Sequence, residues 1–367
     1  MADPPASNAA SPVRGATAQR SAENAPRVIV AGATGFAGAL AADLLWRHPR
    51  FELAAVTGRS NVGRSLAQLY PRYRVPLTIE KLETARVERV DAAIVAYPHG
   101  AAAPLVAQLR DRGVRVVDLS ADFRLHDPAV YGRWYREHLA PELLPEAVYG
   151  LPERYREQIR GADLVANPGC YPTATLLALA PLARESLIGD VVIDAKSGVS
   201  GAGRAPSEKT HFVTADENVN AYGVPRHRHI PEIEQELAAL GADVRVTFVP
   251  HLVPLDQGEL VTCYVTPSAE VGDLASLEAL YADAYAGEPF VELTSKPPGM
   301  RDVRETNICR ISVHHDERTG RLIVFAAIDN LWKGAASQAV QNLNLMFGLR
   351  EEEGIGVGAT RQREAIG

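Results

Sequence analysis

The sequence predicts an α/β protein in which a Rossmann-type, doubly wound parallel sheet is joined to an α+β domain with a mixed sheet. Three observations support this fold class. Apolar strand-like runs alternate with helical patterns as far as residue 186. From residue 190, long strand-like runs follow with few helices between them. The chain has 367 residues, more than the about 250–300 residues that a single core usually holds.

The first half is predicted to form βαβ units. It opens with a β-branched run from Arg27 to Ala31, followed by a glycine-rich turn and a helical pattern. Further elements are expected at 51–60 (strand), 90–100 (strand), 101–113 (helix), 114–123 (strand), 162–170 (strand) and 173–186 (helix). Because parallel strands need long, usually helical, crossover connections, this alternation predicts a parallel sheet.

The second half has a different pattern. Strands are expected at 190–198, 243–254, 258–268, 307–315 and 321–331. The turn at 316–320 is expected to join the last two strands as a hairpin. A helix over 334–348 closes the ordered chain. Few helices among long strands indicate a mixed or antiparallel sheet.

Both ends of the chain are predicted to be loose. Residues 1–26 are rich in Ala, Ser and Pro and lack hydrophobic periodicity, so we expect a disordered tail. This stretch has no apolar core of a secretory signal, and its arginines leave a transit peptide as the alternative. Residues 351–367 are expected to form a second loose tail.

Composition excludes several classes of protein. The net charge is −7, so there is no basic excess for nucleic acid or an anionic membrane. No apolar run reaches the about 18 residues of a membrane-spanning helix. Three cysteines without a CxxC pair, and ten histidines without HExxH, predict neither a disulfide framework nor a metal site. We expect a cytoplasmic protein that acts on a small molecule.

A cofactor loop is predicted directly after the first strand. Gly32, Gly35 and Gly38 form G-x-x-G-x-x-G where a helix begins. Such glycines allow a sharp turn and a close approach of the backbone to a pyrophosphate at the helix N-terminus; the alternative is a tight turn without a ligand. Arg59 and Ser60 follow the second strand, where an NAD site usually has an acidic residue, so NADP is favoured over NAD.

Cys170 follows a strand and a Pro-Gly turn and precedes an apolar helical run. At that position helix N-terminal amides are expected to lower the thiol pKa and to stabilise an oxyanion on an attacked carbonyl. The alternative is a buried structural cysteine. Cys263 and Cys309 lie within apolar strands and are expected to be structural.

Two further segments carry candidate polar groups. His227 and His229 precede a helix, and their spacing puts them on opposite sides of an extended segment, so one is expected to face a site. Glu232 is expected either to orient that imidazole or only to favour the helix dipole. Arg228 adds charge for an acidic substrate. The loop 196–206 is rich in Ser and Gly and offers donors for a phosphate or carboxylate; the alternative is a flexible loop.

Taken together, these segments resemble the N-acetyl-gamma-glutamyl-phosphate reductase family of arginine biosynthesis. The resemblance runs through about residues 27–350, in the family's order: GATGFAG, AYPHG, DLSADFRL, YGLPE, NPGCYPTA, SGVSGAGR, HRHIPEI and AIDNLWKGAASQAVQNLNLMFG. Trp332 stands where that family usually has a smaller aliphatic residue. The resemblance implies a cysteine nucleophile at Cys170 and an acid/base at His229, with His227 left open.

The resemblance also implies a fold like that of aspartate-semialdehyde dehydrogenases. A Rossmann domain (27–169 plus 331–350) would then hold an inserted catalytic and dimerisation domain (170–330), with the last helix packed back on the first domain. A homodimer or homotetramer is expected.

The resemblance implies a full set of site residues. Those expected at NADP(H) are Gly32, Thr34, Gly35, Phe36, Ala37, Gly38, Arg59, Ser60, Pro98, His99, Ser200, Gly201 and Asn330. Those expected at the substrate are Arg124, Ser197, Gly198, Arg204 and Arg228. The catalytic set is Cys170, His229, His227 and Glu232.

The implied reaction is the NADPH-dependent reduction of N-acetylglutamyl phosphate to its semialdehyde through a cysteine thioester, with release of phosphate. The first alternative is the related reductase of lysine biosynthesis, which acts on an aminoadipyl phosphate; Tyr171-Pro172 favours the arginine enzyme. A non-catalytic NADP-binding regulator is an alternative of another class, because it would need the glycine loop but not Cys170.

Overall fold

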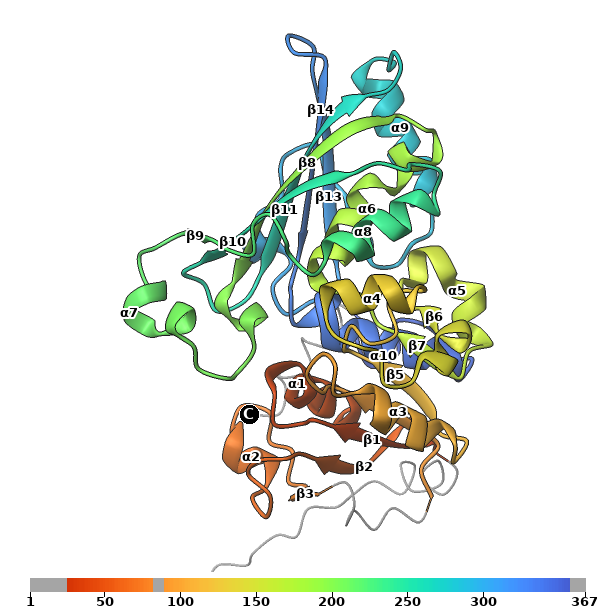
Figure 1. Ribbon diagram of the computed structural model, residues 1–367, viewed down its shortest axis with the longest axis vertical. Coiled ribbons are helices and arrows are strands. Elements are labelled where there is room, and N and C mark those ends of the chain that lie inside the picture. The colour runs from red at the N-terminus through yellow and green to blue at the C-terminus, as the bar shows by residue number, and fades with distance from the viewer. Residues whose placement is uncertain (1–24, 82–88, 357–367) are drawn as a thin grey trace, which may run out of the picture.

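The computed structural model describes residues 25–81 and 89–356. They form two domains, each built on a seven-stranded sheet (Figure 1). The predicted α/β fold class with a second, mixed sheet is confirmed. Most of the expected tail at 1–26, and the last part of the expected tail at 351–367, lie outside the described residues.

The first sheet is parallel throughout, in the order β3-β2-β1-β4-β5-β7-β6. Its strands are β1 (Arg27–Ala31), β2 (Glu52–Thr57), β3 (Ile79–Glu80), β4 (Ala92–Val95), β5 (Arg115–Asp118), β6 (Val148–Tyr149) and β7 (Leu164–Ala166). The strand order switches between β1 and β4: after β1 the chain adds β2 and β3 on one side, and then adds β4 and β5 on the other. Ligands of such sheets bind at the carboxyl ends of the strands at this point.

Helices cover both faces of this sheet, which explains why its strands are continuous apolar runs. One core joins the sheet to α1 (Phe36–Trp46) and α10 (Ser337–Met346). The other core joins it to α3 (Ala103–Arg110). The C-terminal helix therefore returns to the first domain. Shorter elements around this sheet are α2 (Leu66–Leu69), α4 (Pro128–Trp134), α5 (Pro152–Arg160), a 3-10 turn at Pro141–Glu146 and a π-helical turn at Trp332–Ala336.

The second sheet is mixed, in the order β12-β13-β14-β11-β8-β10-β9. Its strands are β8 (Ile188–Gly198), β9 (Asn220–Ala221), β10 (Val246–Val253), β11 (Glu259–Pro267), β12 (Val291–Leu293), β13 (Cys309–Asp316) and β14 (Arg321–Ile328). The expected β13–β14 hairpin is present. Helices α6 (Cys170–Arg184), α8 (Ile230–Ala238) and α9 (Leu274–Ala284) lie on one side of the sheet (Figure 1).

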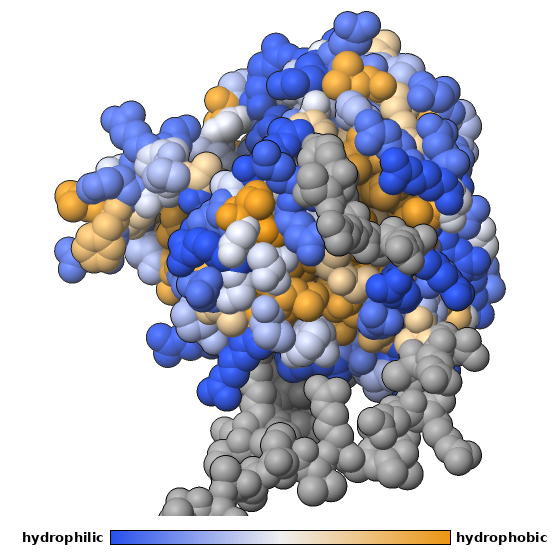
Figure 2. Space-filling view, turned by 90° about the horizontal axis from the view of Figure 1, so that it is seen from below, coloured by the Kyte–Doolittle hydropathy of each residue, from blue (hydrophilic) through white to orange (hydrophobic). Residues whose placement is uncertain are grey.

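The segment between β8 and β9 projects from the body of the molecule (Figure 1). It contains 3-10 turns at Val199–Ala202 and Glu208–Thr210 and the short helix α7 (Phe212–Ala215). Figure 2 shows hydrophobic surface on this projection, and the side chain of Phe212 is 74% exposed. A further 3-10 turn, Met300–Asp302, precedes β13.

Helix α6 begins at Cys170 itself, three residues earlier than the expected start at residue 173. Gly169 is its extended N-cap, and the Thr173 N–H donates to the Gly169 carbonyl. Pro172 lies in the first turn, and a proline in sequence is commonly a sign of a helix boundary. In the first turn, however, proline is tolerated because N–H groups there have no partner within the helix.

The start of the expected C-terminal tail is packed, which contradicts the prediction of a loose segment from residue 351. The Glu351 carboxylate pairs with Arg156 at 2.5 Å. The Asn344 side chain donates to the backbone carbonyls of Glu351 and Glu353, and Ile355 is 3% exposed. The segment has few apolar residues, so nothing in its own sequence indicated that it would be packed. The packing depends partly on Arg156, which is far away in the sequence.

Candidate active site

The glycine-rich loop has the shape that a dinucleotide requires. Gly32 has φ +92°, and a Cβ on it would lie 2.4 Å from the Ala96 carbonyl oxygen. A Cβ on Gly38 would lie 2.3 Å from the Gly32 carbonyl oxygen. A Cβ on Gly35 would meet no atom closer than 3.7 Å. Two glycines are therefore demanded by close packing, while Gly35 keeps open space above the start of α1 for a pyrophosphate.

The residues expected at the dinucleotide surround this loop. Arg59 and Ser60 are exposed at the end of β2, and the Arg59 guanidinium lies 4.9 Å from the ring centre of Tyr97. Pro98 and His99 follow β4, next to Tyr97. The residues present therefore fit a dinucleotide whose 2′ substituent would lie near a cationic side chain.

Arg204, expected at the substrate, lies instead against the cofactor loop. Its Nη1 donates to the Thr34 carbonyl oxygen at 3.2 Å, and its guanidinium lies over Tyr70. Thr34 and the neighbouring Phe36 and Ala37 thus have the projecting segment of the second domain beside them. This placement puts Arg204 beside the loop that is expected to bind the dinucleotide.

Cys170 is the first residue of α6 and is partly exposed. The expected lowering of its pKa is wrong: the pKa of the thiol is raised well above its ordinary value. Burial is the largest cause, followed by the nearby Glu259 carboxyl, while the Tyr171 N–H and Arg124 act in the opposite direction. One helix terminus does not offset the loss of water around the thiolate together with a neighbouring carboxylate.

Glu232 holds the loop that carries Cys170 and does not orient an imidazole. Its Oε1 accepts the Gly169 N–H and the Tyr149 hydroxyl, both at 2.8 Å. Its Oε2 pairs with Arg124 at 3.2 Å. Glu232 is 1% exposed and Arg124 4% exposed. Two roles were expected for Glu232: orienting an imidazole, or only favouring the helix dipole. Neither includes its main contact, the backbone N–H of Gly169 at the N-cap of α6.

Arg124, expected at the substrate, is engaged by the protein on all three nitrogens. Its Nε donates to the Asn167 carbonyl at 2.8 Å and its Nη2 to the Leu119 carbonyl at 2.9 Å. Its Nη1 lies 2.9 Å from the place of a Cβ on Gly169. Arg124 thus ties the ends of β5 and β7 together directly beside the nucleophile.

His227 and His229 both pack against Tyr171, the residue after Cys170, in contrast to the expected opposite orientation. Their ring centres are 4.8 Å apart, and both rings contact Tyr171. The segment before α8 is a turn rather than extended, so alternate residues need not point apart. His229 Nε2 lies 2.6 Å from the place of a Cβ on Gly169.

The two imidazoles differ in their partners. His227 Nδ1 accepts the His229 backbone N–H at 3.2 Å, whereas His229 Nδ1 is buried without a hydrogen-bond partner in the described part of the chain. Burial lowers the pKa of His227 to about 4, and burial with the charges of His227 and Arg124 lowers the pKa of His229 well below its ordinary value. Both rings are therefore neutral near pH 7.

The two remaining candidates near the histidines are His99 and Arg228. His99 Nδ1 accepts the Ala121 N–H at 2.9 Å. Burial, with the charges of Arg124 and Arg228, lowers the pKa of His99 to about 3. Arg228 is exposed, with its guanidinium over the Tyr135 ring. It supplies the solvent-facing positive charge of the site.

The serine and glycine loop meets the end of β14. Asn330 donates to the Ser200 hydroxyl at 3.0 Å and accepts the Gly258 N–H at 2.7 Å. A Cβ on Gly201 would lie 2.8 Å from the Ser197 hydroxyl oxygen. The structure thus gathers the expected Ser197, Gly198, Ser200, Gly201 and Asn330 in one place, at the start of β11.

Sequence reasoning missed Glu259 and Tyr149. Glu259, the first residue of β11, is 0% exposed and adjoins Cys170. The sequence did contain a sign of Glu259, since it is a charged residue at the start of an otherwise apolar strand. Glutamate is rarely fully buried unless it is paired or has a function. Tyr149, which contacts Glu232, lies in the short strand β6 and had no such signal.

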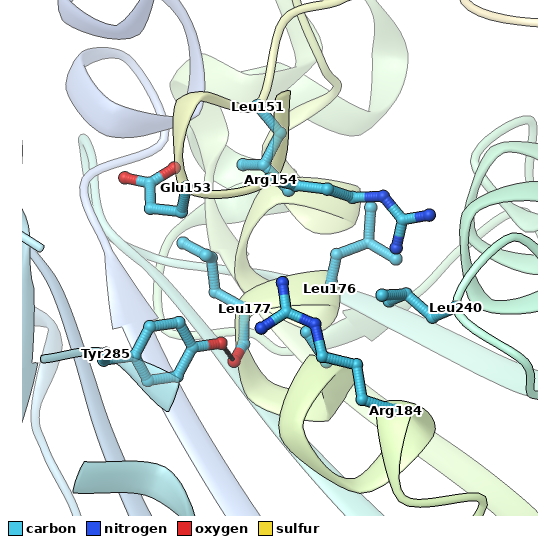
Figure 3. Close-up of a pocket in the computed structure, with 9 residues that line it drawn as sticks. Leu151, Glu153, Arg154, Leu176, Leu177, Arg184, Leu240 and Tyr285 are labelled. Carbon is cyan, nitrogen blue, oxygen red and sulfur yellow. Dashed lines mark hydrogen bonds between the residues drawn. The ribbon is translucent and has the colours of Figure 1, made fainter. Parts of the chain in front are cut away.

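A small, separate pocket lies between α5 and α6 (Figure 3). The Tyr285 hydroxyl there donates to the Leu177 carbonyl. None of the candidate residues is among those that line it: Leu151, Glu153, Arg154, Leu176, Leu177, Ala180, Arg184, Leu240 and Tyr285. Across residues 25–81 and 89–356, no His, Cys, Asp and Glu side chains cluster as metal ligands, and no helix is long and apolar enough to cross a membrane.

The fold and the site together define a class: a dinucleotide-dependent dehydrogenase with a cysteine at the junction of its two domains. Two family models match the chain. Residues 27–162 match "Semialdehyde dehydrogenase, NAD binding domain", and residues 170–330 match "Semialdehyde dehydrogenase, dimerisation domain".

Comparison with curated relatives identifies the family within this class. The N-acetyl-gamma-glutamyl-phosphate reductase of Desulforudis audaxviator is 53% identical over 340 residues, which cover 90% of this chain and 97% of the relative. That of Geotalea daltonii is 48% identical over 90% of this chain and 97% of the relative. The chain therefore belongs to the N-acetyl-gamma-glutamyl-phosphate reductase family, within the semialdehyde dehydrogenases.

Solved structures agree on the fold. Aspartate semialdehyde dehydrogenase II from Vibrio cholerae superposes with a TM-score of 0.69 at 19% identity, covering 89% of this chain and 99% of that one. The expected resemblance, both to the reductase family and to the fold of aspartate-semialdehyde dehydrogenases, is confirmed.

Proposed function

We propose that this protein is a cytoplasmic enzyme of arginine biosynthesis that reduces N-acetyl-L-glutamyl 5-phosphate to N-acetyl-L-glutamate 5-semialdehyde with NADPH, releasing phosphate. One observation carries the proposal. A cysteine at the N-terminus of a helix adjoins a neutral histidine, in a chain that has a dinucleotide loop and is about half identical to N-acetyl-gamma-glutamyl-phosphate reductases over nine tenths of its length.

The covalent part of the reaction is assigned to Cys170. Its sulfur attacks the acyl carbon, the bond to phosphate breaks, and a thioester remains. When bound, the dinucleotide supplies the hydride that reduces this thioester, and Cys170 leaves as a thiolate. The proposal is supported by the first N–H groups of α6 and by the Arg124 charge, which favour negative charge at this position.

His229 is proposed as the hydrogen-bonding and proton-exchanging group at the acyl oxygen. It adjoins Gly169, and its Nδ1 has no other partner among the described residues, whereas His227 already accepts a backbone N–H. Its low pKa keeps the imidazole neutral. It therefore donates a neutral N–H to the developing oxyanion, and an imidazolium is not required.

NADP is proposed as the dinucleotide because Arg59 is exposed at the end of β2. Replacing it by Leu removes a charged contact worth about 1.5–3 kcal/mol, so KM for NADP is expected to rise at least about tenfold while KM for NAD changes little. Arg64→Leu, which removes another exposed arginine of the same segment, is the matched control. An unchanged ratio of the two KM values would contradict this assignment.

The reaction is tested in reverse, with N-acetylglutamate semialdehyde, phosphate and NADP. We expect NADPH formation by the wild type, none by Cys170→Ala, and full activity in Cys263→Ala, a control at a buried strand cysteine. Activity in Cys170→Ala would end the covalent mechanism. Activity only with aminoadipate semialdehyde would establish the lysine-pathway alternative, and binding of NADP without turnover of either would establish the regulator.

A homodimer or homotetramer assembled through the second domain is proposed. The matched model for residues 170–330 is described as a dimerisation domain. The side of the second sheet opposite α6, α8 and α9 carries the partly exposed apolar residues Val192, Tyr264, Ile323 and Phe325. Sedimentation equilibrium is expected to give the mass of two or four chains for the wild type, and a smaller mass for Phe325→Asp.

A further inference from the structure

Glu259 is a buried acid that the proposed mechanism leaves without a task. It opens β11, is 0% exposed, and pairs through its backbone with Ser197 of β8 and Ile328 of β14. Within the described chain, neither carboxyl oxygen accepts a hydrogen bond of ordinary geometry. A buried carboxyl group without hydrogen-bond partners lowers the free energy of unfolding, so its presence here points to a role other than stability.

The group that adjoins Glu259 is the nucleophile. Glu259 pairs with Ile328 across the sheet, and Ile328 and Cys170 both pack against Gly334: the place of a Cβ on Gly334 is 3.3 Å from Ile328 Cδ1 and 2.7 Å from Cys170 Cβ. At this separation the thiol lowers the pKa of Glu259, and the carboxyl raises the pKa of the thiol. Burial and the charge of Asp329 nevertheless raise the pKa of Glu259 to about 8. The charged and titratable groups that face the pair from the surrounding elements are Asp329, Arg124, Tyr171, Tyr222 and Cys309.

Charge balance decides how such a pair can work. A carboxylate that merely stood beside Cys170 would oppose the thiolate, because two negative charges would share one buried site. A carboxylate that takes the thiol proton moves one negative charge from oxygen to sulfur and creates no second charge. Charge-neutral transfer of this kind is the less costly route in a site with little water.

The other base at hand is poorly matched to a thiol. Burial lowers the pKa of His229 well below its ordinary value, so its imidazole is a weak proton acceptor. The Glu259 carboxyl, at about 8, lies much closer to the pKa of a thiol. Proton acceptance is favoured between groups of similar pKa.

We propose that Glu259 is a catalytic residue, the proton acceptor that generates the Cys170 thiolate. The S–H bond breaks and an O–H bond forms on Glu259 as sulfur attacks the acyl carbon. When the aldehyde leaves, the thiolate takes the same proton back. This inference rests on the proposed function for the identity of the acyl group, but the proton transfer itself involves only Cys170 and Glu259.

The test follows alkylation of Cys170 by iodoacetamide between pH 6 and 10, on the full-length chain, with the modified peptide quantified by mass spectrometry. In the wild type the rate should rise with pH and level off above about 8, the pKa of Glu259. Glu259→Gln should react at least tenfold more slowly at pH 8 and without that plateau. Glu259→Asp should retain part of the rate.

Glu292→Gln is the matched control, a strand glutamate of β12 in a partly exposed pair with Arg310, and should behave as wild type. Alkylation of the buried Cys263 and Cys309 reports loss of the fold in any variant. Glu259→Gln reacting as fast as wild type, or faster, would overturn the proposal, because the carboxylate would then only repel the thiolate. If Glu259→Gln does not fold, the pH profile of the wild type tests the proposal by itself. A wild-type alkylation rate that rises to pH 10 without a plateau would also overturn the proposal.

The reverse assay separates this inference from the proposed function. If semialdehyde is turned over and Glu259→Gln lowers kcat at least tenfold with KM unchanged, both stand. If the semialdehyde is turned over with equal kcat in the wild type and in Glu259→Gln, the proposed reaction is supported and the role of Glu259 as proton acceptor is refuted. If no semialdehyde is turned over but the alkylation profile depends on Glu259, the reaction falls and the proton transfer stands.

Discussion

Removing the Glu232 carboxylate should loosen the loop that carries the nucleophile. In Glu232→Ala the Gly169 N–H and the Tyr149 hydroxyl each lose a hydrogen bond of 2.8 Å. The Arg124 guanidinium, 4% exposed, loses its only anionic partner within the described chain. Breaking a buried ion pair from one side costs about 3–5 kcal/mol, so we expect a loss of unfolding free energy in that range.

Glu232→Gln separates shape from charge. The amide keeps one oxygen that can accept the Gly169 N–H, but it no longer pairs with Arg124. The expected cost is near the lower end of the about 3–5 kcal/mol range, because the Arg124 charge still loses its buried partner while the bonds to Gly169 and Tyr149 can be kept. Activity should follow the same order, with Gln retaining more kcat than Ala, because the Gly169 N–H positions Cys170.

The measurement is urea unfolding followed by tryptophan fluorescence, with the reverse assay on the same samples. Glu278→Ala is the control, since Glu278 is exposed on α9 and should change the unfolding free energy by less than about 0.5 kcal/mol. A cost below about 1 kcal/mol for Glu232→Ala, together with full activity, would refute the view that this carboxylate holds the nucleophile loop.

Three further changes have definite expected outcomes. Gly38→Ala puts a Cβ 2.3 Å from a loop carbonyl oxygen and should lower both stability and NADP affinity, whereas Gly35→Ala, with 3.7 Å of space, should lower affinity alone; thermal unfolding with and without NADP checks this. Burial raises the pKa of Asp118 from an ordinary 3.8 to about 7, so the folded chain holds a proton that the unfolded chain releases, and this contribution to stability declines as pH rises from about 4 to 7. Urea unfolding at pH 5 and 8 should therefore show a smaller decline for Asp118→Asn than for the wild type, and equal declines would contradict this. In Lys333→Met the Glu153 carboxylate, which lies 2.5 Å from the Lys333 ammonium, stays buried without its cation. The free energy of unfolding should fall by about 3–5 kcal/mol. The double variant with Glu153→Leu should recover most of this loss in the same urea unfolding measurement.

Local patterns were sufficient where one segment contains its own physical cause. The strand, glycine turn and helix around Gly32 predicted the dinucleotide loop, because the turn closes within the segment: a Cβ on Gly38 would lie 2.3 Å from the Gly32 carbonyl oxygen. The position of Cys170 between a strand and a helix was also evident. The helix start was missed by three residues, since Pro172 indicates a boundary in sequence but is accepted in a first turn.

The properties of the site residues depended on segments far apart in the chain. Arg124, Glu232 and Gly169 come from three separate segments, and only their packing shows that Glu232 holds a backbone N–H and not an imidazole. Arg204 likewise proved to lie at the cofactor loop. Side chains of this kind contact whatever the fold brings near them, and sequence spacing does not record it.

The sequence by itself determined the fold class, the dinucleotide loop, and Cys170 as the candidate nucleophile at the start of a helix. The tertiary structure decided the direction of the Cys170 pKa shift, which is upward, and supplied Glu259 as its neighbour. The physical reason is that the helix N-terminus is a local feature of the chain, whereas burial and the Glu259 charge arise only when β11 packs beside the start of α6. A pKa is a sum over all surrounding groups, and here the distant ones outweigh the local one.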